Sequence, residues 1–240
     1  MPAEKIVLGE VIQKCLQAYL KLFLPIFVHG LIVFSPLMVL NVVIPEMMSQ
    51  GSGTLRDTLL LMIPFAFGSF LSAVLTTFIL EHLRGGKASL AECLQRGFQR
   101  LPLLIALNIL LTIAMLAGFL LLIIPGLFLV ALFSVAVPAF VVEKASLFGS
   151  FQRSAQLTRR AFWPVFALFL LFGVLVMMST PFLLLIGLVS FENLVLANVG
   201  HTLWAILVSG AQSVLTVVIY HELRTKFEGA TSEELLEVFS

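Results

Sequence analysis

The stretch Leu101–Val142 decides the fold: it reads LPLLIALNILLTIAMLAGFLLLIIPGLFLVALFSVAVPAFVV and contains no Asp, Glu, Lys or Arg. A helix that crosses a bilayer needs about 20 apolar residues, so this stretch has room for two. The pair Pro125-Gly126 favours a tight turn, and we place the boundary between the two helices there. The sequence therefore predicts a helical membrane hairpin with spans at about 101–124 and 126–142.

Uncharged runs on both sides of this hairpin extend the pattern to six spans. Charged residues are 11% of the chain, against about 25% in a typical soluble protein, and hydrophobic residues are 60%. In lipid the backbone must satisfy its own hydrogen bonds, which favours helices. We predict an all-α integral membrane protein, with residues 1–240 in a single domain and a cytoplasmic tail at 227–240. The other four spans are expected at about 22–44, 58–80, 162–189 and 201–221.

The basic residues lie almost entirely on one side of this arrangement. Of the 14 Lys and Arg residues, only Arg56 falls on the opposite side. Cytoplasmic loops carry the excess of Lys and Arg, so we predict a cytoplasmic-membrane protein with both termini in the cytoplasm and three hairpins pointing outward. Basic clusters beside membrane spans attract anionic lipid headgroups, which makes lipids of the inner leaflet the expected partners. No nucleic-acid partner is indicated, and the sequence leaves open the oligomeric state and a partner protein in the membrane or envelope.

A short motif recurs before the first, third and fifth spans. It reads LGEVIQKCL at Leu8–Leu16, LAECLQRGF at Leu90–Phe98 and LFGSFQRSA at Leu147–Ala155. Apolar residues recur at helical spacing while Gln and Lys or Arg share the other face, as in an amphipathic helix that lies in the headgroup region. The alternative is a cytoplasmic extension of the following span. We predict three repeat units, at about 7–84, 88–144 and 146–226, each a hairpin preceded by such a helix.

Two sets of candidate site residues follow from the repeat. The basic residues on or beside the repeated helices are candidate contacts for lipid headgroups, because they would face the anionic leaflet. Clusters that end the second and sixth spans are candidate anchors at the interface, since charged side chains at helix ends reach the headgroup level. The headgroup candidates are Lys14, Arg96, Arg100, Arg153, Arg159 and Arg160, and the anchor candidates are Glu81, His82, Arg84, His221, Glu222 and Arg224.

Residues that could carry catalysis are scarce. The chain has no Gly-Xaa-Ser-Xaa-Gly, His-Glu-Xaa-Xaa-His or Cys-Xaa-Xaa-Cys motif and no phosphate-binding glycine loop. His and acid are adjacent in the two anchor clusters and so point to different helix faces, which disfavours a metal site. We therefore expect no enzymatic activity, no metal and no cofactor. The sequence favours a membrane scaffold or accessory protein; the alternative is a transporter or channel for a small or lipid-like solute, suggested by intramembrane prolines and by His29.

Motifs spread over most of the chain resemble a known family. They resemble the membrane domain found beside some bacterial glycerophosphodiester phosphodiesterases, and the stand-alone YciC-type inner-membrane proteins. The resemblance implies six spans in a bacterial cytoplasmic membrane. It does not imply phosphodiesterase activity, because the catalytic barrel is absent from this sequence. The matching segments are Ile124–Val130, Ala136–Glu143, Ser150–Arg159, Phe162–Phe166 and Tyr220–Gly229.

Overall fold

Every regular element in the described part of the chain is an α-helix. The computed structural model describes residues 7–47, 53–83, 89–143, 145–189 and 194–229. Arg84, and all but the start of the predicted tail, lie outside these residues. The helices are α1 (Leu8–Met47), α2 (Gly53–Leu83), α3 (Leu90–Gln99), α4 (Leu101–Leu121), α5 (Ile123–Leu132), α6 (Ala136–Glu143), α7 (Leu147–Arg159), α8 (Phe162–Val189) and α9 (Leu194–Glu228).

Six helical segments within the described residues are long and apolar enough to cross a membrane. This confirms the predicted class, an all-α protein with the helices of a multi-pass membrane protein. The fourth segment joins α5 and α6. The six are Leu8–Val39, Phe65–Leu83, Leu101–Leu121, Ile123–Glu143, Phe162–Pro181 and Val195–Glu228.

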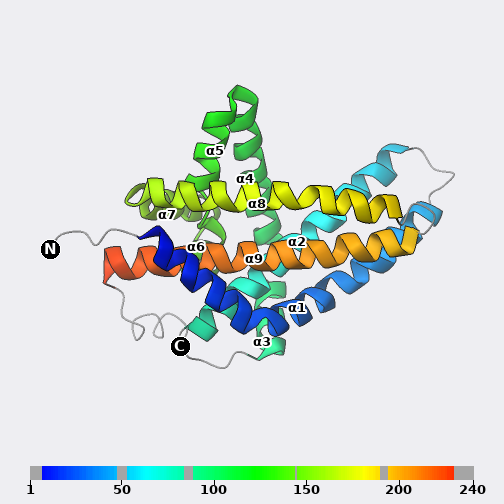
Figure 1. Cartoon of the computed structure of the whole chain (residues 1–240), viewed down its shortest axis with the longest axis horizontal. Helices are drawn as coiled ribbons and strands as arrows, with labels where there is room; N and C mark the ends of the chain where they lie inside the picture. The colour runs from blue at the N-terminus through cyan, green and yellow to red at the C-terminus, as the bar shows by residue number, and fades with distance from the viewer. Residues whose placement is uncertain (1–6, 48–52, 84–88, 144, 190–193, 230–240) are drawn as a thin grey trace.

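Four of these helices, α1, α2, α8 and α9, run along the long axis of the molecule (Figure 1). The largest apolar core lies between α1, α2 and α9 and contains Val33, Leu75 and Val217. Glycine brings α1 and α9 together, because a Cβ on Gly210 would lie 2.6 Å from Cγ2 of Ile26. The start of α1 and the end of α9 therefore lie at the same end of the molecule.

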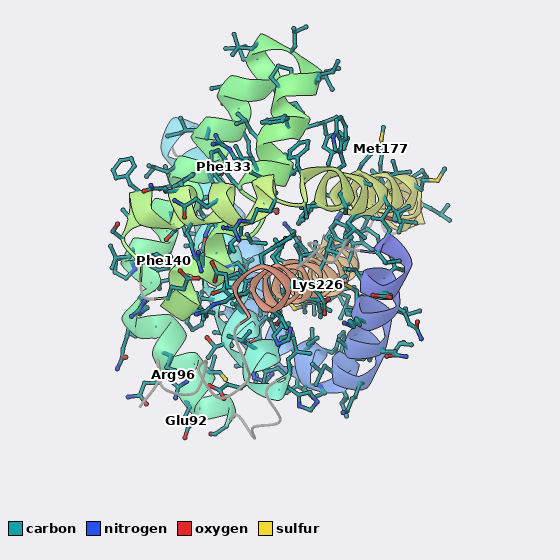
Figure 2. The ribbon with its side chains drawn as sticks, turned by 90° about the vertical axis from the view of Figure 1, so that its left-hand side faces the viewer. Glu92, Arg96, Phe133, Phe140, Met177 and Lys226 are labelled. Atoms are coloured by element: carbon teal, nitrogen blue, oxygen red, sulfur yellow. The ribbon has the colours of Figure 1, made fainter. Side chains whose placement is uncertain are left out.

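The hairpin of α4 and α5 stands across the direction of α8 and α9 and projects from the rest of the molecule (Figures 1 and 2). Its turn is at Leu122, which has an extended backbone with φ −169° and ψ 158°. The prediction that the helices divide at Pro125-Gly126 is wrong by three residues. Both residues fit inside the first turn of α5, since a proline there lacks only an N–H that has no partner in the helix.

The end of the hairpin is held together by its own two helices. Gly118 and Gly126 let them cross closely, because a Cβ on Gly118 would lie 3.0 Å from Cα of Gly126. Beyond this crossing the side chains are apolar and bare: Leu120 is 86% exposed and Ile124 is 79% exposed. Such a surface suits the hydrocarbon layer of a membrane, where apolar exposure carries no cost.

The fourth predicted span is interrupted, because a turn at residues 133–135 separates α5 from α6. Pro138 accounts for this turn: it lacks the N–H that would bond to the carbonyl of Ser134, and its ring crowds that carbonyl. The break is compensated from α7, where the Ser154 hydroxyl donates a hydrogen bond of 2.9 Å to the carbonyl of Leu132. A break in a membrane helix is tolerated where neighbouring side chains satisfy the freed backbone in this way.

The three repeated motifs differ in their surroundings. Leu8–Leu16 continues directly into the first span as part of α1, whereas the second and third motifs lie in the separate helices α3 and α7. In α3, Cys93 is 1% exposed, and in α7, Ser150 and Ser154 are fully buried. The small residues of the second and third faces therefore pack on protein, whereas the large Phe98 of the second face is 70% exposed.

The orientation can be tested with single cysteines and a membrane-impermeant maleimide. Arg56→Cys should react in intact cells, because the charge pattern places Arg56 outside. Gln152→Cys, on an exposed position of α7, should react only after lysis. The unmodified chain is the blank for Cys15 and the buried Cys93. The opposite pattern of labelling would reverse the orientation.

The crossing at Gly118 can be tested by thermal unfolding in detergent. Gly118→Ala should lower the stability by about 1–3 kcal/mol, because the added methyl overpacks the hairpin. Gly173→Ala is the matched control: it lies in α8 with nothing within 4 Å of the added Cβ, and a helical Gly→Ala change there should stabilise by about 0.5–1 kcal/mol. Equal effects in the two variants would show that the hairpin does not cross at Gly118.

Candidate functional site at the charged end

Ion pairs concentrate at the end of the molecule where α1 begins and α9 finishes. We call this region the charged end and define it by the ion-paired residues there, which come from six helices. Figure 2 looks onto it, with Lys226 of α9 in the middle and Arg96 of α3 at the lower edge. Its members are Glu10, Lys14, Glu81, Arg96, Glu143, Arg153, Glu222, Arg224, Lys226 and Glu228.

Arg153 is the centre of the largest network at the charged end. Its Nε donates to both oxygens of Glu143, at 2.9 and 2.8 Å. Its Nη1 and Nη2 donate to the two oxygens of Glu228, both at 2.6 Å. One side chain of α7 thus joins the end of α6 to the end of α9. The hydrogen bond to Glu228 raises the pKa of the Arg153 guanidinium above its usual range, and Glu143 adds to this effect against the opposing influence of burial.

Tyr220 and Arg224 extend this network along α9. The Tyr220 hydroxyl is buried and donates a 2.8 Å hydrogen bond to Oε1 of Glu143. Arg224 Nη1 donates to the Tyr220 oxygen at 3.4 Å, and its Nε lies 3.6 Å from Oε2 of Glu228. Tyr220, Glu143 and Glu228 were not predicted from the sequence. Each is a single polar residue near a helix end, with no spacing pattern that shows what it contacts.

A second group of ion pairs joins the start of α1 to the end of α9. Lys14 Nζ lies 2.6 Å from Oε1 of Glu222, whose side chain is only 9% exposed. Lys226 lies 4.0 Å from the other oxygen of Glu222 and 3.8 Å from Glu10. A buried carboxylate needs such partners, because an unpaired charge in an apolar environment is very costly. These contacts fix the start of α1 beside α9.

The α3 helix is attached through arginine. Arg96 Nη1 lies 3.4 Å from Oε1 of Glu81 on α2. Arg100 donates to the carbonyl of Phe140 at 3.4 Å and lies over the Phe140 ring, 5.9 Å from its centre. Beside them, burial raises the pKa of the Cys93 thiol to about 11. Cys93 is therefore a small apolar side chain in the packing of α3, with little thiolate at neutral pH.

Some of the anchor candidates form ion pairs, and others line a shared hollow. Glu81, Glu222 and Arg224 each have a charged partner at the charged end. His82 and His221 line the same hollow between α1, α2 and α9. The structure thus brings the ends of the second and sixth spans together. Among the described residues, no group of three or more His, Cys, Asp or Glu could hold a metal ion.

The headgroup candidates fall into two groups according to their partners. Lys14, Arg96 and Arg153 each bind a carboxylate of the protein. Arg100, Arg159 and Arg160 form no ion pair with any residue that the structure describes. No carboxylate of the described residues forms an ion pair with these three arginines. Arg153, with a smaller contribution from Arg160, lowers the pKa of the nearby Glu228 carboxyl. Cations outside an ion pair can attract an anion from outside the chain.

Arg159 and Arg160 flank a hollow of about 290 Å³ between α7 and the end of α9. Arg160 is held by a 3.1 Å hydrogen bond from its Nη1 to the carbonyl of Phe227, and it lies 5.9 Å from the centre of the Phe227 ring. A guanidinium has five N–H donors, so most of those of Arg160 remain for a ligand. The hollow presents two exposed cations to the solvent-facing side of the charged end.

His29, the histidine that the sequence places within a span, is not part of this hollow. It lies in the apolar core. It is 4% exposed and lies against Phe78, with 4.7 Å between ring centres. Its Nδ1 is 2.6 Å from the carbonyl of Pro25, an arrangement in which Nδ1–H donates. The buried Nε2 has no hydrogen-bond partner among the described residues.

The six apolar helices define a multi-pass membrane protein, and the ion pairs of its described residues gather at one end. The chain matches no protein-family model, no curated protein and no solved structure. Its resemblance to YciC-type proteins therefore remains a prediction from short motifs.

Substitution of Arg153 should show that it is a structural joint. Arg153, Glu143 and Glu228 are only 23, 20 and 28% exposed, so Arg153→Gln should cost about 2–3 kcal/mol by leaving two carboxylates without their partner. Arg96→Gln is the control, because its side chain is 45% exposed and its ion pair with Glu81 is longer, at 3.4 Å; it should cost less than about 1 kcal/mol. The measurement is the free energy of unfolding in detergent. Equal losses of stability in the two variants would show that Arg153 does not hold the helix ends together.

Proposed function

We propose that this protein is a non-catalytic scaffold or accessory protein of the bacterial cytoplasmic membrane, and that its charged end binds anionic lipid headgroups of the inner leaflet. The orientation with both termini in the cytoplasm is part of the proposal and is supported by the charge partition in the sequence. The resemblance to YciC-type proteins agrees with this location.

The observation that carries the proposal is the pair Arg159 and Arg160. Arginine binds phosphate through two parallel hydrogen bonds, which gives a guanidinium an advantage over an ammonium group. Two adjacent arginines beside a hollow of about 290 Å³ suit a phosphate-containing headgroup. Glu228 lies in the same hollow, but both of its oxygens accept hydrogen bonds from Arg153, which reduces its repulsion of an incoming anion.

Lys14, Arg96 and Arg153 have a different role in this proposal. Their charges are used within the protein, where they hold helix ends together. The lipid contacts are therefore assigned to Arg159 and Arg160, with Arg100, between α3 and α4, as a further candidate. This assignment separates cations that attract lipid from cations that stabilise the fold.

The alternative function, a transporter or channel for a small or lipid-like solute, is favoured by one observation. The Nε2 atom of His29 is buried in the core, and no described residue hydrogen-bonds to it; unpaired ionisable groups within membrane proteins often belong to a transport pathway. A transporter requires solute flux in liposomes, whereas headgroup binding requires none.

Neutralising the arginine pair should reduce the retention of anionic lipid. In mild detergent, the double variant Arg159→Gln, Arg160→Gln should retain several-fold less phosphatidylglycerol or cardiolipin than the unmodified protein, as measured by native mass spectrometry. Bound phosphatidylethanolamine should be little changed, because the lost attraction is to net negative charge.

The matched control is Arg56→Gln, which removes a cation predicted to lie on the other side of the membrane. It should leave lipid retention unchanged. An unaltered amount of anionic lipid on the double variant, with its unfolding temperature preserved, would overturn the proposal.

A further inference from the structure

An apolar groove lies between α1, α8 and α9, away from the hollow at Arg159 and Arg160. It has a volume of about 390 Å³. It exists because α1 packs closely along α9 but barely touches α8, which leaves a gap that side chains do not fill. Its walls include Leu16, Tyr19, Leu171, Leu175, Trp204 and Leu207.

The two hydroxyl groups in this groove already form hydrogen bonds within the protein. The Tyr19 hydroxyl donates to the carbonyl of Leu207 at 3.2 Å, and the Ser179 hydroxyl donates to the carbonyl of Val176. A polar solute would lose its hydrogen bonds to water on entry and find few replacements, at a cost of several kcal/mol per group. The groove therefore selects an apolar occupant.

The dimensions of the groove narrow the choice further. Its lining runs from Leu168 to Ser179 on α8 and from Trp204 to Leu215 on α9, which is roughly 16 Å along each helix. This length is about half of the ~30 Å hydrocarbon core of a bilayer. A membrane-crossing helix from another chain would run the full ~30 Å, so a groove of this length matches an occupant that reaches through one leaflet only.

The groove also has a direction. On α1 its lining includes Ile12 and Cys15, which bracket Lys14, the partner of Glu222 at the charged end. On α9 the lining begins at Trp204, which lies towards the opposite end of that helix. The groove thus runs from the charged end to about the depth of one leaflet.

We propose that this groove binds one acyl chain of a membrane phospholipid, with the headgroup at the charged end and the terminal methyl group beside Trp204. The site recognises the chain through shape and apolar contact. The site requires no preference for an anionic headgroup. The proposal for the groove is therefore independent of the role of Arg159 and Arg160.

Tryptophan fluorescence gives a direct test. The chain has two tryptophans, and Trp163 is 75% exposed, so Trp163→Phe leaves Trp204 as a reporter inside the groove. The purified Trp163→Phe protein in detergent is titrated with phosphatidylethanolamine that carries bromine either near the end or near the beginning of its acyl chains. Bromine quenches tryptophan on contact, and the unbrominated lipid is the blank.

Quenching should saturate near one lipid per protein and should be at least twofold stronger with bromine at the end of the chain. Ala211→Phe or Ser179→Phe, which place a ring in the groove, should remove the saturable quenching. Val174→Phe is the control, because Val174 is 46% exposed on α8 outside the groove. Brominated lipid should quench Trp204 in this variant as it does in the Trp163→Phe protein.

Three results would overturn the proposal. Quenching that rises with the lipid fraction without saturating would show that Trp204 meets lipid nonspecifically and that no single lipid binds in the groove. Stronger quenching by bromine near the headgroup would reverse the direction of the chain. Equal quenching in Val174→Phe and in a correctly folded groove-filling variant would place the lipid elsewhere. Loss of anionic-lipid retention in the arginine double variant, with saturable quenching intact, would separate this site from the headgroup site.

Discussion

The contact of Arg153 with Glu143 and Glu228 is the interaction on which the arrangement of the helices depends most. It joins α7 to the ends of α6 and α9 in one place. Without it, two carboxylates would remain close together, partly buried and without their shared cation. A charge-assisted joint is also directional, because the guanidinium is planar and binds each carboxylate through two hydrogen bonds. The joint therefore sets an orientation as well as a position.

The turn between α5 and α6 allows Glu143, at the end of α6, to reach Arg153. A continuous fourth helix would keep one direction from Ile123 to Glu143, whereas the turn at residues 133–135 lets the two parts point differently. At the turn, the N–H of Ala136 bonds to the carbonyl of Phe133 instead of that of Leu132, and the Ser154 hydroxyl of α7 donates to the carbonyl of Leu132. The same helix thus supplies both the arginine of the joint and the hydroxyl that makes the break tolerable. Its small residues Ser150 and Ser154 are buried for this reason.

The sequence predicted the fold where apolar composition decides it and failed where single contacts decide it. Uncharged runs identify six helices because a membrane demands length and apolarity, and the described residues contain six such helices. The turn at Leu122 was misplaced because Pro125-Gly126 is compatible with both a turn and a helix start. The three motifs suggested equal units, yet Pro138 and the crossing of Gly118 with Gly126 give the middle unit a direction of its own. At the charged end, charge clusters indicated which residues gather, but only three-dimensional distances separate Arg153, which binds carboxylates, from Arg159 and Arg160.

The projecting hairpin does not share the direction of the four long helices. It rises from the half of the molecule that contains α6 and α7 (Figure 1), and its end is apolar and bare, with Leu120 86% exposed. Because it stands across the direction of α8 and α9, a membrane that α8 and α9 cross would hold α4 and α5 along its plane, whereas the sequence predicts that all six segments cross. The direction of this one hairpin therefore decides whether the chain crosses a membrane six times or four.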